Sequence, residues 1–452
     1  MRVAVVGGGI GGLTAAWTLR RERPDAEVTV YEASDRVGGK LRLASLAGAP
    51  VDVGAEALLV RRPDAVTLAY ELGVELVHPL TTAAGIRAGG RLHPVPRGTV
   101  MGVPASAEAV ADVVDADTLA RIAAEPAAEP LPPLTDDVSI GALVAQRLGE
   151  QVVSRLVEPL LAGVYAGVPA RLSLRATVPQ LWQHLRDGGS LVAAAQRSLP
   201  PAPVGPPAPV FGSLAGGLGR LPLEIAQRGD FVVRTGVTVR EIRRVARGFE
   251  LVTGSVPEAT VVAADAVVVA VPANAAARLL AGVAPAAAAG LAEVQLASSV
   301  IVSAAFREVD LPAGSGLLVA PDEGFTVKGV TISSQKWGAA PDGLVRLRTS
   351  IGRAGETRPM QASDAELTAV ALADLRALLG IDTPPVDTLV TRWGGGLPQY
   401  DVGHVERMAA VGAAVAQVPG LEVCGAVYDG VGVPAVIGSA REAVRSLTGT
   451  QA

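Results

Sequence analysis

The first thirty or so residues alternate between short apolar runs and one helical stretch. Residues Arg2–Val6 form a Val-rich run that ends in glycine, which is typical of a buried parallel strand. Residues Ile10–Arg21 place apolar side chains at helical spacing and end in basic residues, and Glu27–Tyr31 again indicates a strand. The chain therefore opens with a predicted βαβ unit of about 30 residues.

The same patterns predict the later elements. A helix is expected over 64–72, and residues 139–161 carry apolar side chains on one helical face. A hairpin is expected over 86–95, with Gly89-Gly90 as its turn. Short helices and loops are expected over 105–133, strands over 231–234, 237–245, 249–253, 265–271 and 421–424, a mixed block over 300–351, and helices over 363–379 and up to residue 447. The Pro-rich stretch Pro200–Pro209 suggests an extended linker or lid.

Composition and charge narrow the class of protein. A chain of 452 residues with 49% hydrophobic and 18% charged residues fits two or three packed domains. The mean hydropathy of +0.38 invites a membrane interpretation. The most apolar region, 259–296, is nevertheless interrupted by charged residues and prolines, so we expect no integral membrane association. A net charge of −5 does not suggest a nucleic-acid partner.

Cysteine and histidine offer no metal or disulfide chemistry. The single cysteine, Cys424, excludes an intrachain disulfide, and the four histidines are too scattered for a metal site. His404 is interpreted as structural. The opening sequence MRVAVVGGG has no separate basic segment and only a short apolar run, so we expect no signal peptide and a cytoplasmic location.

A glycine-rich loop follows the first strand. Gly7, Gly9 and Gly12 fit the pattern G-x-G-x-x-G, in which the glycines permit a tight turn, a close approach to a pyrophosphate, and close packing of helix on sheet. Glu32 ends the next strand, at about the spacing expected of an acid that accepts a ribose hydroxyl. The loop alone is a weak signal, but a strand, a helix and an acid in this order predict a dinucleotide site.

Two further segments distinguish a flavin from a nicotinamide. DRVGGK over 35–40 and DVGAEA over 52–57 resemble the extended signature of flavoproteins of the amine-oxidase and porphyrinogen-oxidase superfamily. The glycine-rich turn at 425–434 resembles the segment that closes over the flavin in that superfamily. The resemblance implies an FAD cofactor. The residues expected to hold it are Gly7, Gly8, Gly9, Ile10, Gly11, Gly12, Glu32, Ala33, Gly39, Lys40, Gly54, Ala55, Glu56, Ala57, Val239, Trp393, Val431, Gly432 and Val433.

Four more segments narrow the resemblance to the porphyrinogen oxidases. They are LAGVYAG at 161–167, FGSLAGGLGRLP at 211–222, Arg392-Trp393 with LPQYDVGH at 397–404, and SSQKW at 333–337. The match runs nearly end to end, and the last segment is similar to the soluble bacterial branch. Membership of that branch implies oxidation of coproporphyrinogen III to coproporphyrin III with oxygen, release of hydrogen peroxide, and a role in haem biosynthesis.

The resemblance also implies an architecture, described as α/β, or α+β overall. Cofactor motifs occur at the start, middle and end of the chain, so the FAD-binding domain must be discontinuous. We expect a Rossmann-like FAD-binding domain from 1–80, 211–280 and 390–452. An antiparallel-sheet substrate domain is expected from 81–105 and 281–389, and a helical domain with the Pro-rich linker from 106–210.

Coproporphyrinogen carries four propionates, so its pocket needs cations. Arg61, Arg62, Arg91 and Lys336 are the candidates, although each arginine could equally be a solvated surface residue. Lysine is rare in this chain, which favours Lys336, and Tyr165 could line the pocket or fill the core. One departure is clear: the residues before the hairpin read Ala-Ala-Gly at 83–85, where membrane-bound protoporphyrinogen oxidases often carry an arginine.

No side chain is assigned as a catalytic acid or base, because a flavin performs the redox step and the protein positions it. Expected partners are the porphyrinogen, molecular oxygen and, transiently, a ferrochelatase. Protoporphyrinogen IX oxidase and another flavin amine oxidase or desaturase remain alternative activities. A flavin- or prenyl-binding carrier on the same fold is the non-enzymatic alternative.

Overall fold

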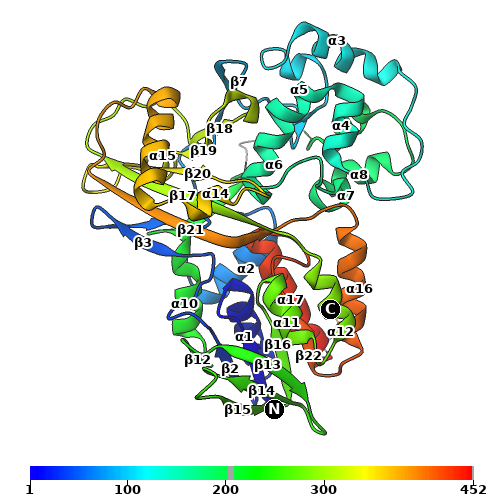
Figure 1. The fold of residues 1–452 in the computed structure, drawn as a ribbon, viewed down its shortest axis with the longest axis vertical. Helices are drawn as coiled ribbons and strands as arrows, with labels where there is room; N and C mark the ends of the chain where they lie inside the picture. The colour runs from blue at the N-terminus through cyan, green and yellow to red at the C-terminus, as the bar shows by residue number, and fades with distance from the viewer. Residues whose placement is uncertain (202–207, 450–452) are drawn as a thin grey trace.

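The computed structural model describes residues 1–201 and 208–449, so the centre of the Pro-rich stretch lies outside the described residues. Figure 1 shows a sheet with flanking helices in the lower half, a second sheet at the upper left, and a group of helices at the upper right. The mixture of helices and sheets confirms the predicted α/β class.

A five-stranded parallel sheet forms the lower half. Its order is β12 (Val232–Arg234), β2 (Glu27–Tyr31), β1 (Arg2–Val6), β16 (Ala266–Val269) and β22 (Leu421–Val423). The sheet thus joins strands from the beginning, the middle and the end of the chain. β1 and β2 have the predicted bounds, because short Val-rich runs are typical of strands in a parallel sheet.

Side chains of β1 point alternately to the two faces of the parallel sheet, and each face is covered by a different layer. Val3 and Val5 pack with α1 (Ile10–Glu22), α2 (Pro63–Leu72), α10 (Leu221–Arg228) and α17 (Val433–Thr448). Ala4 and Val6 pack on the other face, against a second layer. That layer contains β13 (Val239–Arg244), β14 (Phe249–Thr253), β15 (Thr260–Ala264), α11 (Ala273–Leu280), α12 (Pro285–Ala292) and α16 (His404–Ala416).

A seven-stranded sheet stands above the first. Its order is β21 (Asp387–Pro398), β17 (Leu296–Phe306), β20 (Val345–Ile351), β19 (Val327–Thr331), β18 (Gly316–Val319), β7 (Gly85–Ala88) and β8 (Arg91–Pro94). Every neighbouring pair is antiparallel except β18 and β7. α15 (Asp364–Leu379), which begins with a capping box of Ser363 and Glu366, packs its buried leucines on one face of this sheet. The other face is left for the cavity described below.

The third body is helical. It contains α3 (Ala116–Ala124), α4 (Ile140–Leu148), α5 (Glu150–Val152), a π-helical turn (Val153–Val157), α6 (Glu158–Tyr165), α7 (Leu174–Thr177), α8 (Pro179–Leu185) and α9 (Leu191–Ser198). The amphipathic stretch 139–161 is helical as predicted but is interrupted at Gly149, whose φ of 98° does not fit a helix.

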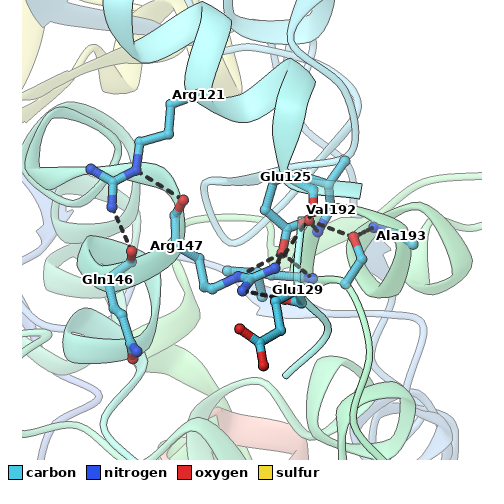
Figure 2. A network of polar contacts seen from close by, with 9 residues as sticks. Arg121, Glu125, Glu129, Gln146, Arg147, Val192 and Ala193 are labelled. Atoms are coloured by element: carbon cyan, nitrogen blue, oxygen red, sulfur yellow. Dashed lines mark hydrogen bonds and ion pairs between the residues drawn. The ribbon is translucent and has the colours of Figure 1, made fainter. Parts of the chain in front are cut away.

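A buried carboxylate holds this helical body together. Glu125 accepts hydrogen bonds from the Ser190 hydroxyl and from two backbone N–H groups at the start of α9, and Arg147 lies 2.7 Å away as its ion-pair partner (Figure 2). Arg121 in turn donates to the carbonyls of Gln146 and Arg147 (Figure 2). Burial would raise the pKa of Glu125, but the hydrogen bonds from Ser190, the α9 backbone and Arg147 outweigh it and lower the pKa.

The remaining elements are short. They are β3 (Leu43–Leu46) with β4 (Ala49–Asp52), β5 (Leu58–Leu59) with β11 (Phe211–Leu214) and β6 (Leu76–Val77), β9 (Thr99–Val100) with β10 (Val103–Pro104), α13 (Ser333–Trp337), α14 (Arg358–Gln361), and 3₁₀ turns at Glu108–Val110, Glu125–Ala127, Leu218–Arg220 and Pro321–Glu323. Among the described residues, none of the helices combines the length and apolar character needed to cross a membrane. The described ranges also contain no cluster of three or more residues arranged to hold a metal ion.

Candidate flavin and substrate site

One cavity of about 1140 Å³ connects the two sheets. Its lower wall is formed by segments that follow the carboxyl ends of β1, β2, β16 and β22, which is where open parallel sheets bind ligands. Its upper wall is formed by β17, β19 and β20, and the end of α6 closes one side. The volume is slightly above the roughly 300–1,000 Å³ of a common small-molecule pocket.

The three motif glycines play different steric roles. A Cβ on Gly12 would lie 1.9 Å from the Gly7 carbonyl oxygen, and one on Gly7 would lie 2.5 Å from the Ala270 oxygen, so both positions require glycine for packing. A Cβ on Gly9 would meet no heavy atom within 4 Å. Gly9 lines the cavity, so this open space is where a cofactor phosphate can approach the backbone.

Glu32 is held in place beside the loop. Its carboxylate accepts hydrogen bonds from the Gly8 N–H at 2.7 Å and from the Ser34 N–H at 2.9 Å, and the side chain lines the cavity. A carboxylate with two oxygens has further lone pairs for a ribose hydroxyl. Gly8 itself does not line the cavity; its contribution is the hydrogen bond that orients Glu32.

Two helices direct uncapped N-termini at the cavity. Gly9 precedes α1 and Gly432 precedes α17, and neither helix has a side-chain cap or an acidic residue in its first turn. Helices α3, α4 and α9, by contrast, are capped by Asp115, Ser139 and Ser190. Free N–H groups and the partial positive charge of a helix start suit an anionic ligand group.

The segment 39–55 supplies a cation and a backbone stretch that packs closely at Gly54. A Cβ on Gly54 would lie 1.9 Å from the Lys40 carbonyl oxygen, and the indole N–H of Trp393 donates to the Val53 carbonyl at 2.8 Å. The Lys40 ammonium lines the cavity, and burial lowers its pKa to about 8. Lys40 is half-buried and forms no ion pair with the residues that the structure describes, which suits it to a phosphate.

The turn between β22 and α17 is supported from behind. The Tyr400 hydroxyl donates to the Ala426 carbonyl at 2.6 Å, and the His404 ring lies 2.8 Å from the Val427 carbonyl. The two rings stack with centroids 3.9 Å apart. Burial lowers the pKa of His404 to about 4, so the ring is neutral at pH 7 and its role here is positional.

The cavity gathers most of the residues expected to hold the cofactor. Those on its wall are Gly7, Gly9, Ile10, Gly11, Glu32, Ala33, Gly39, Lys40, Gly54, Ala55, Val239, Trp393, Val431, Gly432 and Val433. Gly8, Gly12, Glu56 and Ala57 do not line the cavity.

The residues expected to bind substrate lie elsewhere. Arg61, Arg62 and Arg91 are exposed and do not line the cavity. Tyr165 is buried against Tyr400, with ring centroids 5.4 Å apart. The Lys336 ammonium lies 3.1 Å from the buried Glu56 carboxylate.

The structure brings other cations to the cavity. Lys328 and Arg348 stand on β19 and β20, and Arg240 and Arg278 lie near the nucleotide end. Lys328 shares the rarity that singled out Lys336, since the chain has only three lysines. Nothing local in the sequence distinguishes Arg348 from the other arginines, because its burial depends on strands far away in the chain.

Comparisons with known proteins agree with this geometry. The family model described as flavin containing amine oxidoreductase matches residues 10–448. A coproporphyrinogen III oxidase of Mycobacterium leprae is 43% identical over 98% of this chain and 97% of its own length, and one of Bacillus subtilis is 32% identical over 98% and 97%. The solved structure of an Exiguobacterium protein named as a protoporphyrinogen oxidase superposes with a TM-score of 0.87 at 30% identity and covers 100% of this chain and 99% of that one.

These matches span nearly the whole chain and confirm the resemblance found in the sequence. The family's description also makes the cofactor a flavin, which fits the uncapped helix starts and the open space above Gly9. The chain is an oxidoreductase that belongs to the flavin-containing amine oxidoreductase family and, within it, to the group of its coproporphyrinogen III oxidase relatives.

Proposed function

We propose that this protein binds FAD in the lower part of the cavity and oxidises coproporphyrinogen III to coproporphyrin III in haem biosynthesis. The observation that carries the proposal is the single cavity that runs from the dinucleotide loop to the face of the seven-stranded sheet. Such a cavity brings a cofactor ring and a flat substrate into contact. The names of the two relatives above supply the choice of substrate.

Each wall segment has a defined part in holding FAD. The N–H groups at the start of α1 donate to the pyrophosphate, with Lys40 as a counter-charge. Glu32 accepts from a ribose hydroxyl. The start of α17 and the turn at 425–432 stabilise negative charge near the ring, because the helix start is the positive end of the dipole.

The substrate part of the cavity has apolar walls and two cations. Gly163, Ile301 and Leu318 supply surface for a flat macrocycle, and Lys328 and Arg348 supply charge for carboxylates. When bound, the flavin would supply the two-electron oxidation of the macrocycle, with oxygen as the final acceptor and hydrogen peroxide as its product. Three two-electron oxidations convert a porphyrinogen to a porphyrin, so each macrocycle consumes three oxygen molecules.

Protoporphyrinogen IX oxidation is the alternative, favoured by the name of the Exiguobacterium structure. The two substrates differ in charge: coproporphyrinogen has four propionates and protoporphyrinogen two. The test is to supply each porphyrinogen to the flavin-loaded protein in air and to follow porphyrin fluorescence and peroxide together. A faster reaction of protoporphyrinogen at matched concentration would assign the alternative activity.

The proposal includes a cytoplasmic location, a three-part division of the chain with the boundaries given above, and a transient contact with a ferrochelatase that receives the porphyrin. A single, buried cysteine suits a reducing compartment. Fractionation of cells that express the untagged protein tests the location. Recovery only after detergent extraction of membranes would contradict it.

A further inference from the structure

The three lysines of this chain have distinct surroundings. Lys336 is paired with Glu56 at 3.1 Å, and Lys40 lies at the nucleotide end of the cavity. Lys328 is the most enclosed, with 6% of its surface exposed, and it lines the cavity from strand β19. A buried ammonium is rarely found without a counter-ion, because the cost of removing a charge from water is large.

Lys328 lacks such a counter-ion among the described residues. Its one hydrogen bond goes to the Gly352 carbonyl at 2.5 Å, which leaves two N–H groups of the ammonium to satisfy. Glu356 is the carboxylate that acts on Lys328 electrostatically, but it forms no ion pair with Lys328 among the described residues and accepts a hydrogen bond from the Arg353 backbone N–H at 3.0 Å. Burial, with a smaller contribution from Arg353, lowers the pKa of Lys328 to about 8.

A second cation lines the same cavity from the neighbouring strand. Arg348 on β20 pairs in register with Thr331, three residues beyond Lys328 on β19. Its guanidinium donates one hydrogen bond, to the Asp52 carbonyl at 2.9 Å, and leaves further N–H groups for a ligand. The helix α6 packs on β18 and β19, and its end contributes Ala162, Gly163 and Val164 to the wall.

We propose that Lys328 is the receptor for a carboxylate of the substrate, with Arg348 as a second contact on the next strand. The inference rests on the proposed function, in which that carboxylate is a propionate of coproporphyrinogen. It replaces the four cations expected from the sequence as the main anchor. It also explains why so polar a residue occupies a buried strand position with an apolar wall opposite.

The test uses the stable product as a probe. Coproporphyrin III and its uncharged tetramethyl ester are titrated, in the same dilute detergent, into flavin-loaded wild-type protein and into Lys328→Met and Lys328→Gln. Methionine keeps the length of the stem without charge, and glutamine keeps a donor for the Gly352 carbonyl. We expect both variants to bind the acid about tenfold more weakly, the loss of roughly one charge-assisted hydrogen bond, and to bind the ester like wild type.

Other outcomes overturn the inference. Unchanged affinity for the acid, an equal loss for acid and ester, or wild-type affinity in Lys328→Gln would each show that the charge of Lys328 does not receive a carboxylate. If wild-type protein oxidises coproporphyrinogen while the variants bind the acid normally, only this inference fails. If wild-type protein neither binds the acid nor oxidises the porphyrinogen, the proposed function fails with it.

Wild-type protein provides an independent measurement should the variants fail to fold. The charged groups that act on Lys328 are Arg353, which lowers its pKa, and Glu356, which raises it. Affinity for the acid should therefore fall as the pH rises above about 8, where Lys328 loses its proton, while affinity for the ester stays constant. An acid affinity that does not change over this range contradicts the inference.

Discussion

Two glycines of the same loop should respond to substitution in opposite ways. Gly9 has ordinary extended backbone angles, with φ of −75° and ψ of 178°, and a Cβ atom there would meet no heavy atom within 4 Å. Gly9→Val should therefore leave the stability of the cofactor-free protein unchanged to within about 1 kcal/mol. Gly12→Ala should unfold at lower temperature, because its Cβ would lie 1.9 Å from the Gly7 carbonyl oxygen.

The effect of Gly9→Val on the cofactor should be large. A valine side chain occupies the space in which a phosphate would approach the N–H groups of α1. The loss of two charge-assisted hydrogen bonds, at roughly 1.5–3 kcal/mol each, weakens FAD binding by about 3–6 kcal/mol, which is on the order of a hundredfold to ten-thousandfold.

The assay compares purified wild type, Gly9→Val and Gly12→Ala. The visible absorbance of flavin per protein gives the bound fraction, and circular dichroism gives the thermal midpoint of each apoprotein. We expect Gly9→Val to be folded and colourless, and Gly12→Ala to be less stable. A folded Gly9→Val protein with a full complement of flavin would refute the placement of the pyrophosphate above Gly9.

Three further changes test other parts of the account. Lys336→Met removes the ion-pair partner of the buried Glu56 carboxylate, which keeps only the charge of Arg348 nearby, so we expect a loss of about 1–3 kcal/mol and a lower thermal midpoint, partly recovered by adding Glu56→Gln; an unchanged midpoint would contradict a structural role. Lys40→Met should weaken FAD binding about tenfold without changing the thermal midpoint of the apoprotein, and equal FAD affinity would exclude Lys40 as a phosphate contact. The folded-state pKa of Glu125 is lowered, so its contribution is present above the unfolded value of about 4.5 and is lost as the pH falls through the folded pKa. Urea unfolding from pH 6 to pH 3 should therefore show the stability difference between wild type and Glu125→Gln shrink with acidification; a constant difference would be inconsistent with the network in Figure 2.

The local parts of the fold follow from the sequence. β1 and β2 have the predicted bounds because short Val-rich runs favour strands. The glycine-rich loop could also be predicted, because the glycines that the loop requires lie close together in a short segment. The interruption at Gly149 could not, because a glycine is tolerated in many helices and only the φ of 98° shows the break.

The substrate cations could not be chosen from the sequence alone. Lys336 and Glu56 are 280 residues apart, so no local pattern shows that they pair. Lys328 lies in a short strand whose sequence does not indicate a ligand site. Its position on the cavity wall depends on α6 and the opposite sheet. The rarity of lysine drew attention to Lys336, and only the fold shows that Lys336 pairs with Glu56 while Lys328 lines the cavity.

A side-by-side assay of the two porphyrinogens tests the central claim most directly. Flavin-loaded protein is given coproporphyrinogen III or protoporphyrinogen IX in air at matched concentrations, and porphyrin and hydrogen peroxide are measured together. The account predicts faster oxidation of coproporphyrinogen, by about tenfold for each additional carboxylate contact, with three peroxides formed per porphyrin. Faster oxidation of protoporphyrinogen, or formation of neither porphyrin, would contradict it.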